Sequence, residues 1–284
     1  MKRILALALS VTVCLCASAQ EAVTWTRAKM DASRTGCTFP SADNVPEALG
    51  TMKGKKYVAP NGKTFRRGST PAVAALMIEA QPKMASVKEV IGHSENGMPR
   101  GRGQYALSSW FIDELMAATS ELTGKKVDLG ITNFGGIRAD MPKGDVTVDD
   151  ILSIFPFRNS LCYVSVKGAD LRAVFERMAE RSMQVVGGVK VVVEDHVLKS
   201  CLIGGEPLDD EKIYGLATIS FLLSGGDGLD LSKGAIEIID TEKYIYDVML
   251  PYVRTLTASG KTVDYEADDR VVYINTSNNR RYPR

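Results

Sequence analysis

The sequence predicts an α/β fold with an α+β-like layout, in which mixed β-sheets are flanked by helices. Strand-like apolar runs alternate with helical patterns between residues 105 and 274, which favours layers of sheet and helix. Several of these runs are joined by short turns such as Gly204-Gly205 and Asp209-Asp210, so antiparallel hairpins are expected beside any parallel pairs. At 45% hydrophobic residues, the chain can bury a sizeable core.

Helices and strands follow from local patterns. Thr147 and Asp150 resemble an acidic variant of a capping box, which predicts a helix that Pro156 ends, with Phe157 in the loop beyond it. Apolar residues at helical spacing predict further helices at residues 71–91, 105–122, 170–181 and 244–256. The expected strands are 126–132, 161–166, 189–193, 197–202, 214–219, 235–239 and 270–274.

The two ends of the chain have the composition of segments outside the main domain. Residues 1–19 combine a basic start, an apolar stretch and a small-residue cleavage site, which predicts a signal peptide and a secreted or periplasmic protein without a membrane span. Residues 20–104 are interpreted as an N-terminal lead that mostly wraps over the surface. The main domain is expected at 105–274, and 275–284 as a frayed tail.

Charge and cysteine content exclude several classes of function. The 35 basic and 34 acidic residues nearly balance, which gives no support for nucleic acid or an anionic membrane as partner. Beyond the signal peptide the cysteines are Cys37, Cys162 and Cys201, and an odd number allows at most one internal disulfide. The fold therefore does not depend on a disulfide framework.

Two glycine-rich turns carry polar side chains suited to a ligand. The segments 131–138 and 220–228 each follow an apolar run that reads as a buried strand. Paired glycines let backbone amides approach a ligand closely. Arg138 supplies a planar fork for phosphate or hydroxyl oxygens, and Asp227 can accept two hydrogen bonds, which suits a ribose diol. Together the turns predict a site for a small polar ligand.

With a third motif, Phe155-Pro156-Phe157-Arg158-Asn159, these turns resemble a known family in their order and spacing. The sequence is similar to the C-terminal, nucleotide-binding domain of the 5′-nucleotidase family, hydrolases of nucleotide catabolism that also act on UDP-sugars and cyclic nucleotides. The resemblance runs from about residue 105 to residue 274, and it implies the layered fold of that domain.

The resemblance also implies roles for the matching positions. Phe157 and Phe221 would clamp a nucleobase between two aromatic faces, and Asn133 would hydrogen-bond the base. Arg138 would hold ribose or phosphate oxygens, and Asp227 the ribose hydroxyls. The substrate-binding residues expected from the family are thus Asn133, Arg138, Phe157, Phe221, Gly226 and Asp227.

Each position also has a purely structural interpretation. A lone phenylalanine beside a strand is usually core, Arg138 could bridge to Asp140, and a glycine-rich turn occurs in any protein.

An upstream arginine of the family also contacts the ligand. Arg100 or Arg102 is the candidate for it here, although Ser108-Ser109 replaces the usual glycine-asparagine.

Whole 5′-nucleotidases also carry a metallophosphoesterase domain, in which two metal ions activate water and polarise the phosphate. Its ligands come from histidine-rich elements, whereas this chain has two histidines, His93 and His196, neither in such a setting. We therefore expect no metal site, cofactor or catalytic residue in this chain, and two divalent metals on a partner metallophosphoesterase. The leading hypothesis is a secreted nucleotide-recognition subunit of a split phosphohydrolase; the alternative is a stand-alone, non-catalytic nucleoside or nucleotide binding protein.

Overall fold

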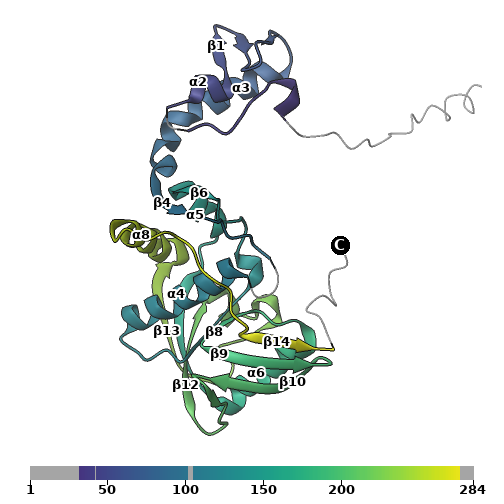
Figure 1. Cartoon of the computed structure of the whole chain (residues 1–284), viewed down its shortest axis with the longest axis vertical. Helices are drawn as coiled ribbons and strands as arrows, with labels where there is room; N and C mark the ends of the chain where they lie inside the picture. The colour runs from purple at the N-terminus through teal and green to yellow at the C-terminus, as the bar shows by residue number, and fades with distance from the viewer. Residues whose placement is uncertain (1–31, 42, 102–104, 276–284) are drawn as a thin grey trace, which may run out of the picture. The chain divides into compact units, whose positions relative to one another are not determined.

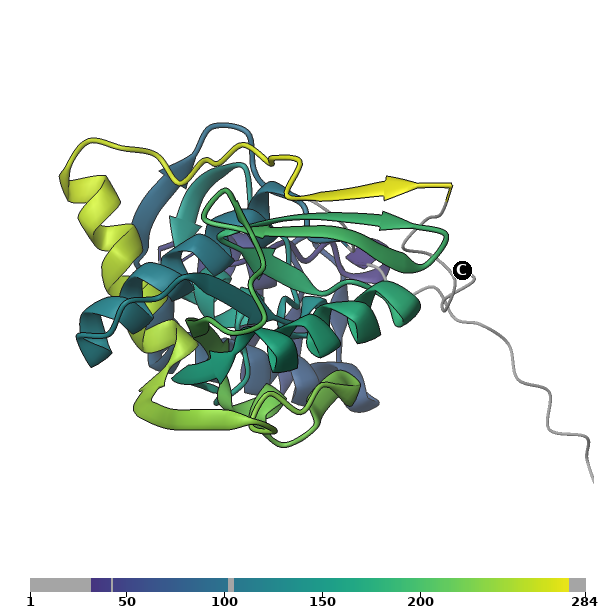
Figure 2. The same cartoon turned by 90° about the horizontal axis from the view of Figure 1, so that it is seen from below.

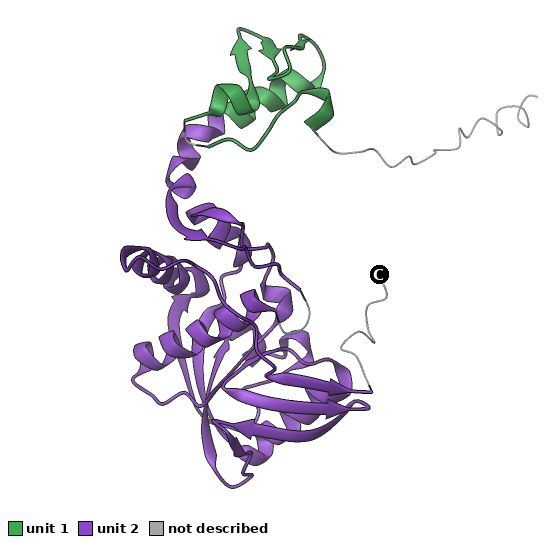
Figure 3. Ribbon diagram, viewed as in Figure 1, with its two compact units in different colours: residues 1–78 green, residues 79–284 purple. Residues whose placement is uncertain are grey.

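The computed structural model of the chain describes residues 32–41, 43–101 and 105–275. It divides into two compact units, one ending at Ile78 and the other beginning at Glu79 (Figure 3). The expected signal peptide, Arg102 and residues 276–284 of the expected tail lie outside the described residues. No helix within these ranges is long and apolar enough to cross a membrane.

The first unit has a small core of its own. Its antiparallel sheet β1-β2-β3 buries Tyr57 and Ala59, which pack with Ala74. The Tyr57 hydroxyl donates to the Leu49 carbonyl at 2.7 Å. Residues 20–67 are polar and rich in turns, which predicted a surface lead and not a core of this kind. The elements are η1 (Ala32–Arg34), α2 (Val45–Leu49), β1 (Thr51–Lys53), β2 (Lys56–Val58), β3 (Thr64–Phe65) and α3 (Ser69–Ala80).

The second unit contains two larger sheets and the helices packed on them (Figure 1). It begins at Glu79, well before residue 105. Strand β4, which precedes helix α4 in the sequence, pairs with β6, which follows it. Its elements are η2 (Gln81–Lys88), β4 (Val90–Ser94), α4 (Ala106–Thr123), β5 (Leu129–Thr132), η3 (Phe134–Gly136), β6 (Gly144–Thr147), α5 (Val148–Ile154), β7 (Ser160–Lys167), α6 (Gly168–Arg181), β8 (Val185–Gly187), β9 (Val189–Glu194), β10 (Val197–Ile203), β11 (Glu206–Pro207), β12 (Ile213–Ile219), α7 (Ser220–Leu223), η4 (Gly226–Gly228), β13 (Ala235–Tyr244), α8 (Ile245–Ala258) and β14 (Val271–Ile274).

The central sheet has the strand order β13-β7-β12-β5-β8. Only the β12–β5 pair is parallel, and the other three pairs are antiparallel. The second sheet, β11-β10-β9-β14, likewise combines antiparallel pairs with the parallel pair β14–β9, and Figure 2 shows β14 in yellow alongside β9 and β10. The predicted α/β class with mixed sheets and flanking helices is confirmed.

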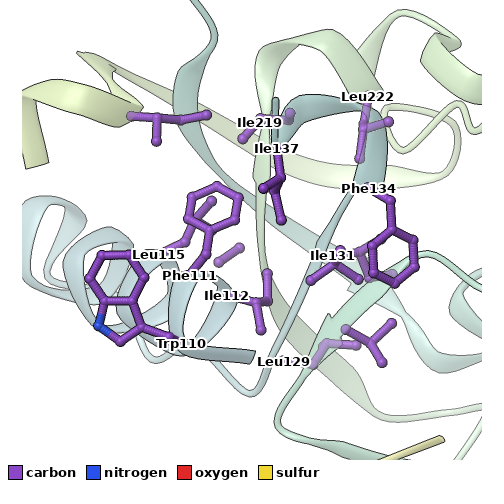
Figure 4. Close-up of a cluster of buried hydrophobic side chains, with 14 of the residues drawn as sticks. Trp110, Phe111, Ile112, Leu115, Leu129, Ile131, Phe134, Ile137, Ile219 and Leu222 are labelled. Atoms are coloured by element: carbon purple, nitrogen blue, oxygen red, sulfur yellow. The ribbon is translucent and has the colours of Figure 1, made fainter. Parts of the chain in front are cut away.

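The core of this unit forms where α4 packs on β5 and its neighbours. Trp110, Phe111, Ile112 and Leu115 of α4 are buried together with apolar side chains of β5 and β12 (Figure 4). Gly130 allows this close approach, since a Cβ there would lie 2.7 Å from the Met116 side chain. Helix α4 thereby covers the strand that leads into the first glycine turn.

The predicted capping box at the start of α5 is confirmed. The Asp150 backbone N–H donates to the Thr147 hydroxyl at 3.2 Å, and the Thr147 backbone N–H donates to the Asp150 carboxylate at 2.7 Å. The helix ends at Ile154, directly before the Phe155-Pro156 pair. This fixed end sets the direction of the loop that carries Phe157.

Candidate functional site

Three segments that are distant in sequence meet at one edge of the central sheet. Because β5 and β12 are adjacent and parallel, their carboxyl ends lie side by side and lead into the two glycine turns. Strand β7 runs antiparallel to β12 with Leu161 opposite Ile219, so the loop before β7 reaches the same edge. The backbone N–H of Ser160 donates to the Ser220 hydroxyl at 3.1 Å and ties this loop to α7. Crevices outside strand carboxyl ends are where ligands bind in many open α/β sheets.

A cavity of about 260 Å³ opens at this edge. Five of the six residues expected to bind substrate line it. The sixth, Gly226, is the residue before Asp227. The lining residues are Asn133, Gly135, Gly136, Arg138, Phe157, Asn159, Phe221 and Asp227. The structure therefore brings the three sequence motifs into one pocket.

Both expected aromatic residues are partly exposed at the pocket. Phe157 is 43% exposed and Phe221 is 40% exposed, whereas Phe155, two residues earlier, is 1% exposed and packs on Phe111. A Cβ on Gly226 would lie 2.5 Å from the Phe221 ring, so this glycine leaves the space that the ring occupies. Apolar rings left open beside polar groups are typical of ligand pockets. These positions do not fit the alternative in which both rings are core.

Arg138 lies against the face of Phe157. Its guanidinium carbon is 5.7 Å from the ring centroid, and one terminal nitrogen is 3.4 Å from the Gly135 carbonyl oxygen. Among the described residues, Arg138 forms no ion pair with Asp140; the Asp140 carboxylate accepts a hydrogen bond from the Arg100 backbone N–H at 2.8 Å and lies 4.0 Å from the Arg100 side chain. Arg100 is not among the lining residues, and the other upstream candidate, Arg102, lies outside the described residues.

Asp227 has a backbone conformation that few residues adopt. Its φ of 50° and ψ of 21° are left-handed, and in the same turn Gly225, two residues earlier, has a φ of 87° and Gly228, the next residue, a φ of 77°. Aspartate tolerates this region better than most residues, at a small conformational cost. Such strained positions are concentrated at functional sites. The turn presents the Asp227 carboxylate at the pocket.

Asn133 joins the two glycine turns. Its side-chain amide nitrogen donates to Asp227 Oδ2 at 2.7 Å, and the residue is 5% exposed. The resemblance to the family predicted a hydrogen bond from Asn133 to a base. The bond to the carboxylate is a contact that the sequence analysis did not predict.

Three lining residues were missing from the expected set: Gly135, Gly136 and Asn159. All three belong to motifs that the sequence analysis had singled out, so their position within those motifs was the available signal. The two glycines leave space for the Asn133 amide, because a Cβ on Gly136 would lie 2.9 Å from its oxygen and a Cβ on Gly135 would lie 3.2 Å from its nitrogen.

Within the described ranges, no group of three or more histidine, cysteine, aspartate or glutamate side chains is arranged to hold a metal ion. His93 lies 3.3 Å from Asp145 and 3.9 Å from Glu95 on the surface. His196 occupies the β9–β10 hairpin turn with a φ of 65°. The buried thiols of Cys162 and Cys201 are unpaired, and burial raises their pKa values to about 12 and about 11. Neither thiol is therefore ionised near neutral pH.

Comparison with known proteins gives curated relatives that are all longer than the matched region. Protein UshA of Escherichia coli is 29% identical over 206 residues, which cover 66% of this chain and 37% of that protein. Protein UshA of Yersinia enterocolitica is 33% identical over 164 residues, which cover 56% of this chain and 29% of that protein. This chain thus spans about a third of the length of the curated relatives it matches.

Solved structures agree on the fold. The 5′-nucleotidase precursor of Thermus thermophilus superimposes with a TM-score of 0.64 at 24% identity, covering 78% of this chain and 46% of that chain. The NAD nucleotidase of Haemophilus influenzae does so with a TM-score of 0.56 at 19% identity, covering 78% of this chain and 48% of that chain.

The family model described as 5′-nucleotidase, C-terminal domain matches residues 90–234. This range includes β4, every residue that lines the pocket and all three motifs, and it spans just over half of the chain. The chain belongs to the 5′-nucleotidase C-terminal domain family.

Proposed function

We propose that this chain is the nucleotide- or nucleoside-recognition subunit of a 5′-nucleotidase-type phosphohydrolase. The observation that carries the proposal is the pocket at the sheet edge, where two partly exposed phenylalanines stand beside Arg138 and Asp227. A nucleoside has the matching chemistry. Its base is a flat apolar face for the two rings, and its ribose diol is a pair of donors for the carboxylate.

The catalytic step is assigned to a separate metallophosphoesterase chain. A dinuclear site of the family's kind draws on several histidines, and this chain has two in all. If residues 1–19 are a signal peptide, the two chains would meet in the periplasm or outside the cell. The partner would dock over the mouth formed by Phe157, Phe221, Arg138 and Asp227 and bring two divalent metals to the phosphate.

Purified alone, the chain is expected to release no phosphate from AMP, even with added Mn²⁺, Co²⁺ or Zn²⁺, because no group of side chains among the described residues is arranged to hold a metal ion. A colorimetric phosphate assay on a preparation free of contaminating phosphatase measures this. Hydrolysis should begin when a secreted metallophosphoesterase lacking its own C-terminal domain is added. Metal-dependent turnover by the isolated chain would contradict the split arrangement. Nucleotide binding without turnover in any mixture would favour the stand-alone binding protein.

A second prediction concerns ribose recognition by Asp227. Wild-type protein is expected to bind adenosine about tenfold or more tightly than 2′,3′-dideoxyadenosine, because loss of both hydroxyls leaves a desolvated carboxylate at a cost of about 1–3 kcal/mol or more. Asp227→Ala should bind both ligands weakly and about equally. Isothermal titration of the two ligands against the two proteins measures the difference. Equal binding of both ligands by the wild type would make Asp227 a turn residue only.

A further inference from the structure

The side chain of Asn133 does not cap the short helix η3 that follows it. The residue stands at the amino-terminal end of η3, where an asparagine often caps a helix, yet its side chain makes no capping hydrogen bond. The turn is closed by backbone groups, with the Gly136 N–H donating to the Asn133 carbonyl at 3.1 Å. Capping therefore does not account for an asparagine at this position.

The amide of Asn133 instead reaches 94 residues along the chain to Asp227, donating to Oδ2 at 2.7 Å. Asp227 is an exposed residue with a left-handed backbone, and Gly225 and Gly228 of the same turn also have positive φ. A turn of this composition does little to restrict a carboxylate by packing. A buried amide that donates to one oxygen restricts its direction and leaves the other oxygen for a ligand.

Two glycines leave free the space that the amide occupies. A Cβ on Gly136 would lie 2.9 Å from Asn133 Oδ1, and a Cβ on Gly135 would lie 3.2 Å from Nδ2. Oδ1 is buried and has no hydrogen-bond partner among the described residues. A buried amide oxygen without a partner is energetically costly, which indicates that the amide is oriented by the bond that its nitrogen makes to Asp227.

We infer that Asn133 is a positioning residue, which preorganises the Asp227 carboxylate for the ribose hydroxyls. This inference rests on the proposed function and deepens it, since it assigns the ribose preference of the pocket to a pair of residues. Holding the carboxylate in place before the ligand arrives lowers the ordering cost of binding. The role differs from a contact between Asn133 and the base, which would act on every ligand that contains the base.

Isothermal titration with adenosine and with 2′,3′-dideoxyadenosine separates these roles. The variants are Asn133→Ala, Asp227→Ala, the double variant of both, and Phe221→Ala as a control that removes base stacking. The quantity compared is the ratio of the two dissociation constants. Phe221→Ala should weaken both ligands and leave this ratio unchanged.

Asn133→Ala is expected to reduce the ratio about five- to tenfold, by weakening adenosine while leaving dideoxyadenosine nearly unchanged. In the Asp227→Ala background the same substitution should have no further effect on the ratio, because the group that it positions is absent. Gly136→Ala is the second variant. It keeps Asn133 but forces the amide to move, and it should also reduce the ratio.

Two results would contradict the positioning role of Asn133. If Asn133→Ala and Gly136→Ala keep the wild-type ratio, or if Asn133→Ala weakens both ligands equally, the positioning role is overturned. Thermal unfolding of each variant shows whether it is folded. Failure of the wild-type protein to bind adenosine at all would overturn the proposed function, whereas a discriminating wild type with an unaffected Asn133→Ala variant overturns this inference alone.

Discussion

Replacing Asp113 and Asp268 together with alanine is expected to lower the free energy of unfolding of the second unit by about 3–5 kcal/mol. Both carboxylates face the guanidinium of Arg270, whose side chain is 6% exposed. Asp113 accepts from both terminal nitrogens, at 2.9 and 3.0 Å, and Asp268 accepts from Nε and one terminal nitrogen, at 2.5 and 2.8 Å. Without them the buried positive charge loses both of its carboxylate partners, although the Val186 carbonyl stays at 3.1 Å.

Removal of the arginine should cost less than removal of both acids. Arg270→Met leaves two carboxylates, but Asp113 is 36% exposed and Asp268 is 57% exposed, so water can solvate them. Urea denaturation followed by far-ultraviolet circular dichroism compares the variants. The assignment of Arg270 as the buried charge would be wrong if Arg270→Met were the less stable of the two. Neither variant touches the pocket, so adenosine binding by folded protein should be unchanged.

The same cluster implies a pH dependence. Hydrogen bonds from Arg270 hold the pKa of the Asp268 carboxyl below its ordinary value, against the opposing effect of burial. Because the folded pKa is the lower one, the stabilisation is present above the ordinary carboxyl pKa of about 4 and is lost as the pH falls through the folded value. The stability difference between wild type and Asp268→Ala should therefore narrow as the pH is lowered below about 4. A constant difference down to strongly acidic pH would exclude this contribution.

Phe221→Ala is expected to weaken adenosine binding by about tenfold or more, on the scale of about 1–3 kcal/mol for base–aromatic stacking. Phe157→Ala should act likewise. Both rings are already 40–43% exposed, so their loss should change thermal stability little. Isothermal titration with adenosine and a thermal melt of each variant measure the two effects.

Phe155→Ala is the matched control for the clamp. It lies two residues from Phe157 in the same motif, but it is 1% exposed and its ring centroid is 4.4 Å from that of Phe111. Its truncation should cost about 3–5 kcal/mol of stability, as expected for a buried aromatic residue. If Phe157→Ala and Phe221→Ala instead unfold several degrees earlier and bind adenosine as well as wild type, the two rings serve the core and not a ligand.

Local sequence patterns were sufficient for most elements of the second unit. The apolar period predicted a helix at 105–122 where α4 covers Ala106–Thr123, and the run at 161–166 lies within β7. The Thr147 capping box and its Pro156 stop were also predicted from neighbouring residues. These features depend on contacts within a few residues, so the information for them is local.

Strands β1–β3, β4, β6 and β8 were not predicted from the sequence. Each is a strand of at most five residues, too short to show a period, and each exists because a distant or neighbouring strand pairs with it. Strand β8, for example, is defined by pairing of Val185–Gly187 with the end of β5. Short strands of this kind are selected by packing and pairing, and intrinsic preference contributes little to them.

The residue types of the pocket could be recognised from sequence, since Asn133, Arg138, Phe157, Phe221, Gly226 and Asp227 lie in motifs that resemble a known family. Their chemistry was therefore determined by the sequence alone. Their partners were decided by the tertiary structure. The parallel pairing of β5 with β12 brings Asn133 within 2.7 Å of Asp227, and the packing around Arg270 joins acids from α4 and from the segment before β14. The contacts of Asn133 with Asp227 and of Arg270 with Asp113 join residues about 90 to 160 positions apart, and their energy depends on burial and direction, which a linear pattern does not encode.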